Sequence, residues 1–467
     1  MKRLLLFTAF FALCLPAIGT FYTGYFNDDA RHVLAARSLL HGHYGDLSDP
    51  NQAPIINQLP GYPLILALAG ANETTGKLLS CAFHAGTTAL LFSFAAPAAA
   101  GAALLLALHP FAITMSGTLM TEPAFLLATV VSLLLLTRGK LFAALMCAAF
   151  SGWIRPEGFL LLAAITTCRI KSLPAKDRLA LSIPFIFWAL PFIRNMLVSS
   201  TPAGYISELA GTSVAINILS NALYYFHAVP LVSVGIYYGG GAVSGWMTGL
   251  CAAFWLALGA GLTVLLQKDE SRERALYLTL SLGAHLLWVN HTPRYILPLI
   301  PFIFEAVLSG LVLQKEHGRK LAFSFAAATL ALMLFQDWGV LRAGLSKADS
   351  RKHPPSAILW LKDNTPPNAI VMTKYREKTF YLSGRKTIGY YYNPDISSWI
   401  KTVDENNVDY LLIDDSAETV AVTPQREAGR RAAFETIAAF AANRNYFLQV
   451  YRAKTGLVCQ RIKADAE

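Results

Sequence analysis

Residues 242–266, with the sequence AVSGWMTGLCAAFWLALGAGLTVLL, contain no charged side chain and are followed by the basic residue Lys268. A helix needs about 20 apolar residues to cross the hydrocarbon core of a membrane. The same pattern recurs before and after this stretch, with apolar runs separated by short basic clusters. The sequence therefore predicts a membrane protein made of helices.

The composition supports this prediction and divides the chain in two. Charged residues make up 15% of the 467 residues, against about 25% in soluble domains. Residues 1–336 hold 34 of the 68 Asp, Glu, Lys and Arg side chains, and residues 337–467 hold the other 34. We expect a membrane domain over 1–336 and a water-soluble domain over 337–467. Disordered, collagen-like and disulfide-scaffold classes are excluded.

The apolar runs predict about eleven transmembrane helices, and the basic residues between them fall on alternate sides. This alternation places the N-terminus in the cytoplasm and, after an odd number of spans, residues 337–467 outside. Two large outer loops follow, at 23–77 and 199–241. A cleaved signal peptide over 1–20 would leave residue 28 on the same side. The expected spans are 4–22, 78–96, 98–113, 119–137, 141–154, 156–170, 179–198, 242–266, 275–290, 295–313 and 321–336.

The C-terminal region has the pattern of an α/β domain. Its expected strands are rich in Val, Ile, Leu and Tyr, and they alternate with two expected helices. We find no glycine-rich phosphate loop and no metal-ligand cluster in it. The expected strands are 369–373, 408–413, 446–452 and 457–462, and the expected helices are 396–406 and 424–443.

The net charge of +10 does not indicate nucleic-acid binding, because the basic residues of 1–336 lie in short clusters between apolar runs. Of the six cysteines only Cys459 lies in the C-terminal region, which excludes a disulfide within it. Cysteine usage therefore does not identify a compartment.

The first outer loop opens with an acidic pair, Asp28-Asp29, in the sequence Tyr25-Phe-Asn-Asp-Asp-Ala-Arg-His32. An Asp at the start of a helix accepts backbone N–H bonds and complements the helix dipole. Capping explains one acid but not two in tandem, followed by Arg31 and His32. We therefore expect the pair to have a functional role.

Two further features lie on the same side. Gln58 precedes Pro60, Gly61 and Pro63, which predict a tight turn back into the apolar layer. Glu122 begins a span in a Thr-Glu-Pro context, where it is either a structural cap or a functional acid.

Three arginines, Arg155, Arg194 and Arg294, lie at outer ends of spans, where the positive-inside rule disfavours them. Each could anchor its helix at the interface. Together with the acids on that side, they favour an anion-binding cavity, since arginine holds phosphate by paired hydrogen bonds. Tyr295 follows Arg294 directly.

The expected loop 199–241 is rich in aromatic residues, which we expect to form a belt at the membrane interface. Stacking on sugar rings is the alternative. The loop's aromatic residues are Tyr205, Tyr224, Tyr225, Phe226, Tyr237 and Tyr238.

In order and on a common side, these motifs resemble the GT-C class of glycosyltransferases, which use polyprenyl-phosphate sugars. The class includes the protein O-mannosyltransferases and the lipid A aminoarabinose transferase. The resemblance covers most of 1–336 and extends to an outer soluble domain. Its elements are Asn27–Arg31, Pro60–Pro63, Thr121–Pro123, Arg155–Gly158, Arg194-Asn195 and Pro293–Tyr295.

The resemblance implies that Asp28 is the catalytic base, that Asp29 and Glu122 support the site, and that arginines hold the lipid phosphate. Arg194 and Arg294 are the candidates, because Asn57 and Gln58 stand where some relatives have a lysine before the proline turn. Arg31, Gln58, Arg155 and Tyr295 complete the expected substrate-binding set.

The implied reaction moves a monosaccharide from a polyprenyl-phosphate donor to a lipid, glycan or protein acceptor at the outer face of a bacterial inner membrane. A single displacement inverts the anomeric centre. Nucleic acid is not an expected partner, whereas membrane lipids are.

Two other functions remain open, a transporter or flippase of lipid-linked sugars and a non-catalytic envelope scaffold. A transporter should carry polar residues at mid-depth and paired halves, and the sequence shows no repeat. Metal use is also open, since carboxylates with a phosphate can bind Mg²⁺ or Mn²⁺.

Overall fold

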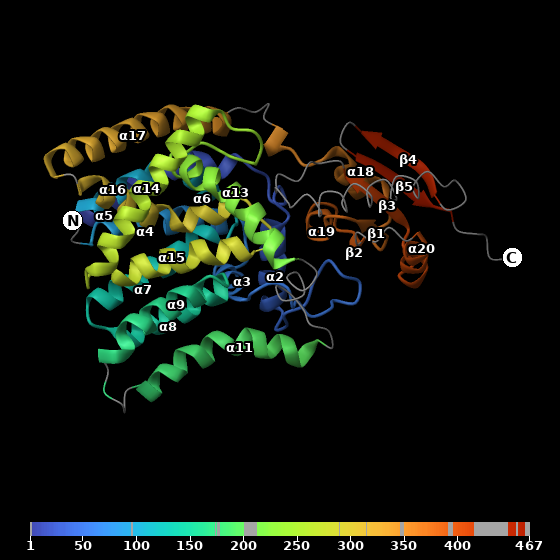
Figure 1. Ribbon diagram of the computed structural model, residues 1–467. Coiled ribbons are helices and arrows are strands. Elements are labelled where there is room, and N and C mark those ends of the chain that lie inside the picture. Colours follow the sequence, from blue (N-terminus) through green and yellow to red (C-terminus); the bar gives the residue numbers. More distant parts are fainter. Residues whose placement is uncertain are drawn as a thin grey trace. The chain divides into compact units, whose positions relative to one another are not determined.

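The computed structural model describes residues 2–94, 97–172, 174, 178–199, 213–288, 290–313, 315–345, 350–390, 396–414, 447–453 and 456–462 (Figure 1). The chain forms two compact units. The helical unit comprises Met1–Thr20, Ile56–Ile65 and Thr74–Ser346. The sheet unit comprises Phe21–Ile55, Leu66–Glu73 and Lys347–Glu467.

This division differs from the expected one, which separated residues 1–336 from residues 337–467. Contacts group Phe21–Ile55, the first half of the expected outer loop, with the C-terminal region. The acidic pair Asp28-Asp29 is therefore part of the sheet unit, whereas Glu122 and the three arginines belong to the helical unit.

The helical unit is built from apolar helices joined by short connections (Figure 1). Helices α3 (Gly61–Leu68) and α4 (Glu73–Leu91) extend across its boundary in the sequence. Its other helices are α1 (Lys2–Cys14), η1 (Leu15–Gly19), α5 (Pro97–Ala107), α6 (Pro110–Ser116), α7 (Glu122–Thr137), α8 (Leu141–Ile154), α9 (Gly158–Arg169), η2 (Ile170–Ser172), η3 (Leu179–Leu181), α11 (Ser182–Val198), α13 (Val214–Ser233), α14 (Gly245–Gln267), α15 (Arg272–Leu287), η4 (Pro293–Leu299), α16 (Ile300–Val312) and α17 (Lys315–Leu345).

Glycines allow α14 and α16 to pack backbone against backbone. A Cβ on Gly261 would lie 1.7 Å from the carbonyl oxygen of Ala306, and a Cβ on Gly310 would lie 2.0 Å from that of Ala257. Small residues at a helix contact are a common way to bring membrane helices close together. The stretch 242–266 is thus a closely packed part of the bundle.

Among the described residues, five helices are long and apolar enough to cross a membrane, or six if the pair α5 and α6, bent by 61°, counts as one span. Four shorter apolar helices accompany them, at Arg3–Gly19, Glu122–Thr137, Leu141–Ile154 and Gly158–Arg169. The fold is that of a polytopic helical membrane protein, but the expected count of eleven spans is not confirmed.

The expected loop 199–241 contains a 20-residue helix, α13, that is apolar enough to cross a membrane. The prediction of an outer loop did not include this helix, because Asn217, Asn221 and His227 interrupt the apolar pattern in the sequence. Asn217 and Asn221 are buried within the unit, where packing rather than hydropathy decides the structure.

The sheet unit has a mixed five-stranded sheet of order β2-β1-β3-β5-β4 (Figure 1). β1 pairs in parallel with β2 and β3, and β5 pairs antiparallel with β3 and β4. The elements are α2 (Asp28–Leu40), η5 (Ser350–Lys352), α18 (Ser356–Asn364), β1 (Ile370–Thr373), α19 (Arg376–Ser383), β2 (Lys386–Gly389), α20 (Ile396–Glu405), β3 (Tyr410–Asp414), β4 (Phe447–Ala453) and β5 (Gly456–Arg461).

Alternating strand residues build one core on each face of the sheet, as the period of two requires. On one face Met372 and Leu411 pack with Val403 of α20. On the other face the next residues, among them Val371 and Leu412, pack with Ile358 and Leu361 of α18.

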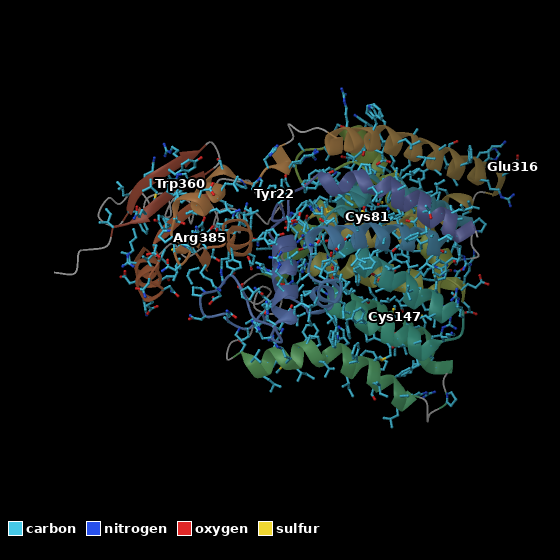
Figure 2. The ribbon with its side chains drawn as sticks, turned by 180° about the vertical axis from the view of Figure 1, so that it is seen from behind. Tyr22, Cys81, Cys147, Glu316, Trp360 and Arg385 are labelled. Atoms are coloured by element: carbon cyan, nitrogen blue, oxygen red, sulfur yellow. The ribbon has the colours of Figure 1, made fainter. Side chains whose placement is uncertain are left out.

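Four strands and α20 lie within two residues of the ranges expected from sequence, and 424–443 lies outside the described residues. α18, α19 and β2 were not expected; α19 and β2 have polar sequences, and α18 is short. The buried Arg385, labelled in Figure 2, fixes part of this region by donating to the carbonyl oxygens of Lys362 and Thr365, 2.7 Å from each.

Candidate active site

The acidic pair begins helix α2 in the sheet unit, and its two members have different surroundings. Asp29 is buried, and its carboxylate accepts from the backbone N–H groups of Gly24 at 2.9 Å and Ala30 at 3.0 Å. Asp28 is half-buried. The local geometry thus gives the structural role to Asp29 and leaves Asp28 as the acid with more access to solvent.

The turn before Asp28 requires unusual backbone conformations. Gly24 has φ +103°, which favours glycine, and Asn27 has φ 60° immediately before the helix. Asparagine tolerates positive φ better than most residues with a side chain. The chain therefore enters α2 through a turn whose shape depends on these two residues.

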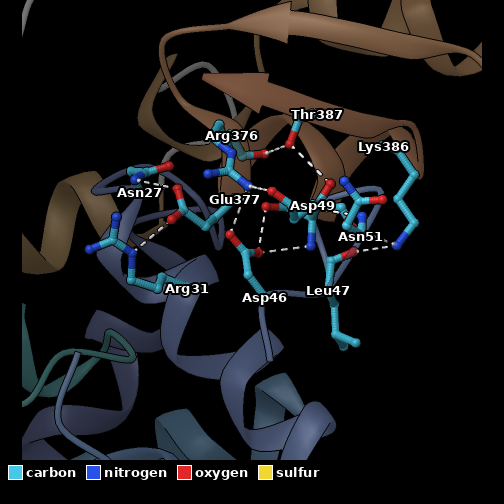
Figure 3. A network of polar contacts seen from close by, with 11 residues as sticks. Asn27, Arg31, Asp46, Leu47, Asp49, Asn51, Arg376, Glu377, Lys386 and Thr387 are labelled. Atoms are coloured by element: carbon cyan, nitrogen blue, oxygen red, sulfur yellow. Dashed lines mark hydrogen bonds and ion pairs between the residues drawn. The ribbon is translucent and has the colours of Figure 1, made fainter. Parts of the chain in front are cut away.

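Arg31 lies one turn along α2, and Glu377 is its ion-pair partner. The Nε atom of Arg31 donates to Oε1 of Glu377 at 2.8 Å (Figure 3). Glu377 raises the pKa of Arg31, and Asp28 adds to this effect. The sequence did not reveal this partner, which is 346 residues away.

In the helical unit, the start of α7, the end of α8 and the start of η4 bring Glu122, Arg155, Arg294 and Tyr295 together. Arg155 follows the end of α8 and donates to Oε1 of Glu122, at the start of α7, at 2.8 Å. It donates to Glu157, just before α9, at the same distance. Of its side chain 9% is exposed, against 3% for Glu122.

This geometry gives Arg155 a structural role. Two carboxylates and the hydroxyl of Thr121, at 3.1 Å, already occupy its guanidinium. The ring of Tyr295 lies 5.5 Å from its Cζ atom, in the range of a cation–π contact. A phosphate would have to compete with both acids for Arg155.

Arg294, in η4, lies at the margin of the same cluster. Its Nε atom is 4.0 Å from Oε1 of Glu122, the limit of an ion pair, and 21% of its side chain is exposed. It is therefore more accessible to an anion than Arg155. The Oε2 atom of Glu122 is buried and has no hydrogen-bond partner among the described residues.

Arg194 and Gln58 lie elsewhere in the helical unit. The Nδ2 atom of Asn195 donates to the carbonyl oxygen of Ile56 at 2.8 Å, and Arg194 donates to Oδ1 of Asn195 at 3.0 Å. The end of α11 is thus tied to the segment that carries Gln58, which is buried.

The expected proline turn continues directly into helix α3. A Cβ on Gly61 would lie 2.6 Å from the carbonyl carbon of Trp153, at the end of α8. Only glycine fits at this position, because the chain passes close to the backbone of α8. The prediction of a tight turn did not include this contact.

Residues of α13 support the segment that carries Arg294, and sequence analysis missed them. Asn221 donates to the carbonyl oxygens of Leu286 and Trp288 and lies 3.0 Å from Nδ1 of His291. Tyr224 stacks on His291 with centroids 4.2 Å apart. Tyr224 and Tyr225 are buried, so the expected interfacial belt is wrong for these two residues.

Among the described residues, no group of three or more His, Cys, Asp or Glu side chains is arranged to hold a metal ion. Glu122 is paired with Arg155, and the acidic pair of α2 has the contacts given above.

Comparison with known proteins gives a likeness of fold. No protein-family model matches the sequence, and no curated protein is similar to it in sequence. ArnT from Cupriavidus metallidurans bound to undecaprenyl phosphate matches with a TM-score of 0.58 and 13% identity, over 98% of both chains. The apo state of that protein matches with a TM-score of 0.54 and 10% identity, again over 98% of both.

This likeness confirms the resemblance inferred from the motifs, because ArnT is the lipid A aminoarabinose transferase. The chain is therefore a polytopic helical membrane protein with a fold similar to that of a GT-C glycosyltransferase.

Proposed function

We propose that the protein is a membrane glycosyltransferase that moves a monosaccharide from a polyprenyl-phosphate donor to an acceptor. The observation that carries this proposal is a fold shared with ArnT over 98% of both chains, in a structure that holds undecaprenyl phosphate. The acceptor is a lipid, glycan or protein. The proposed site faces the outside of a bacterial-type inner membrane, with the N-terminus in the cytoplasm.

Asp28 is the proposed base. Its half-buried position at the start of α2 leaves the carboxylate accessible, while Asp29 accepts the backbone bonds of the turn. An ionised carboxylate can take the proton of an acceptor hydroxyl as the bond to the sugar forms, and such base catalysis contributes about 10²–10⁴-fold.

The reaction is a single displacement. The acceptor oxygen bonds to the anomeric carbon, its proton passes to the carboxylate of Asp28, and the bond between that carbon and the phosphate oxygen breaks. The electron pair leaves with the lipid phosphate, and the anomeric centre inverts. Arg294 and Arg194 are the proposed partners of the departing phosphate, since both are partly exposed.

Glu122 has a supporting role in this proposal. Oε1 is held by Arg155, which leaves the buried Oε2 to accept a hydroxyl proton from a bound sugar or acceptor. Such a bond would orient the substrate without proton transfer.

The proposal is tested by mass spectrometry of envelope lipids and glycans from four strains. One strain produces the parent chain, one lacks it, and two produce Asp28→Asn or Asp404→Asn at matched protein level. Asp404 pairs with Arg461 on the surface of the sheet unit and serves as the control. We expect a sugar-sized mass increment in the parent and the control only.

Two results would count against the proposal. An increment that survives in the Asp28→Asn strain would remove Asp28 as the base. A deletion that changes no lipid or glycan, while it alters the distribution of lipid-linked sugars across the membrane, would favour a transporter.

A further inference from the structure

The residue before the proposed base has a strained backbone that a distant part of the chain holds in place. Asn27 has φ 60° and ψ −47°, outside the regions that most residues adopt. Such a conformation is unfavourable by itself and persists only where its surroundings fix it. Because Asn27 is the N-cap residue of α2, its conformation sets the direction in which Asp28 leaves the turn.

Both ends of the Asn27 amide bond to the start of α19, more than 340 residues further along the chain. Its Nδ2 atom donates to Oε2 of Glu377 at 3.2 Å (Figure 3). Its Oδ1 atom accepts from the backbone N–H of Lys378 at 3.1 Å. These two bonds fix the side chain of the strained residue from one side.

Glu377 also holds the next turn of α2. Its second oxygen, Oε1, accepts from Arg31 at 2.8 Å, so that one carboxylate bridges the residues on either side of the acidic pair (Figure 3). Burial by itself would raise the pKa of Glu377, but Arg31 and, to a smaller extent, Arg376 hold the pKa below its ordinary value. Glu377 is therefore ionised at neutral pH.

Helix α19 is in turn anchored to the loop that follows α2. Arg376 pairs with Asp46 at 2.9 Å and with Asp49 at 3.0 Å. Lys386 donates to the carbonyl oxygen of Leu47 at 2.8 Å (Figure 3). Within the sheet unit, these contacts of Arg376 in α19 and Lys386 in β2 hold the start of α19, and with it Glu377, against the loop after α2.

We propose that Glu377 is a positioning residue for catalysis, which fixes the Asn27 turn and Arg31 and thereby the orientation of Asp28. This inference rests on the proposed function, with Asp28 as the base. In this proposal the C-terminal region supplies the carboxylate that orders helix α2, which bears the base. Glu377 itself does not exchange a proton with substrate.

The test uses the full-length protein in lipid vesicles with undecaprenyl-phosphate monosaccharides as donors. An envelope extract from the deletion strain supplies the acceptor. Glu377→Ala removes both bridges. Since a small misplacement of a reacting group lowers rates by up to about 10²-fold, we expect kcat to decrease about 10- to 100-fold. KM for the donor should change less than about twofold, since no donor contact is removed.

Two further variants separate positioning from loss of fold. Glu377→Gln keeps an oxygen that can accept from Arg31 or Asn27 and should recover part of the lost kcat. Asp404→Asn removes a surface ion pair of the same unit and should keep the parent kcat. Hydrogen exchange at the backbone amides of residues 27–32 should be faster in Glu377→Ala than in the parent or in Asp404→Asn.

The outcomes distinguish this inference from the proposed function. If Asp28→Asn abolishes transfer while Glu377→Ala is as active as Asp404→Asn, the positioning role is overturned and the transferase stands. If Glu377→Gln is as inactive as Glu377→Ala and both lose the cooperative unfolding transition of the parent, Glu377 serves the fold alone. If the parent chain transfers no sugar from any donor, the proposed function is overturned, and the role of Glu377 with it.

Discussion

Helices α2 and α7 both begin with acidic residues, but the groups that surround these carboxylates differ. At the start of α7, Glu122 is almost completely buried and is neutralised by the guanidinium of Arg155 at 2.8 Å. At the start of α2, Asp29 is buried against backbone N–H groups, and Asp28 beside it is half-buried.

The difference indicates which acid is suited to base catalysis. The carboxylate of Glu122 already accepts a hydrogen bond from Arg155 at 2.8 Å. Asp28, next to an acid that already completes the turn, keeps more access to solvent than Asp29. We therefore propose a structural role for Asp29 and the role of base for Asp28, with Glu122 in the supporting role given above.

The largest effect on stability is expected at Arg155. Arg155→Met removes the positive charge that both acids contact, and leaves the buried Glu122 and the half-buried Glu157 without it. Breaking a buried ion pair in this way costs about 3–5 kcal/mol. Thermal unfolding of the purified protein in detergent measures the change.

Arg272→Met is the matched control, because Arg272 pairs with Asp269 and both side chains are exposed, at 42% and 82%. A loss at Arg155 no larger than at Arg272 would show that the buried cluster contributes little. The contrast between α7 and α2 would then lose its basis.

A smaller loss is expected at Asp29. Asp29→Ala leaves the buried N–H group of Gly24 without its acceptor, which costs about 1–3 kcal/mol. Asp28→Asn, one residue away, should leave the unfolding temperature unchanged. Equal destabilisation by the two variants would contradict the division of roles within the pair.

The smallest expected effect concerns how the unfolding temperature depends on pH. The pKa of Glu377 is lower in the folded protein than its ordinary value, so its ion pair with Arg31 stabilises the fold above the unfolded pKa of about 4.3. This contribution is lost as the pH falls through the folded pKa. The unfolding temperature of the parent should exceed that of Glu377→Gln at pH 7, and the difference should shrink below about pH 4. A difference that grows towards low pH would contradict the ion pair.

Much of the fold followed from local patterns. The apolar runs predicted a helical bundle, and runs such as Tyr410–Asp414, rich in Leu and Ile, predicted strands. α13 was missed because it contains asparagines, which interrupt the apolar pattern of the sequence. In the folded chain these asparagines are buried, and Asn221 donates hydrogen bonds to the carbonyl oxygens of Leu286 and Trp288. β2 was missed because Lys386–Gly389 is too short and polar to differ from a loop.

The site was predictable in its residue types but not in its pairings. Arginines at the ends of expected spans were visible as exceptions to the positive-inside rule, and the acids were visible as charges beside apolar runs. Their partners depend on contacts between distant segments, such as Arg155 with Glu122 and Arg31 with Glu377. No spacing in the sequence indicates that the first outer loop is held by α19.

The central claim is that Asp28 is the base of a sugar transfer from a lipid phosphate. The most direct measurement incubates the full-length protein in vesicles with undecaprenyl-phosphate monosaccharides and the envelope extract, and follows the release of undecaprenyl phosphate. We predict that Asp28→Asn lowers this rate about 10²–10⁴-fold at an unchanged unfolding temperature, and that Asp404→Asn matches the parent. Transfer by Asp28→Asn at the parent rate would contradict the account.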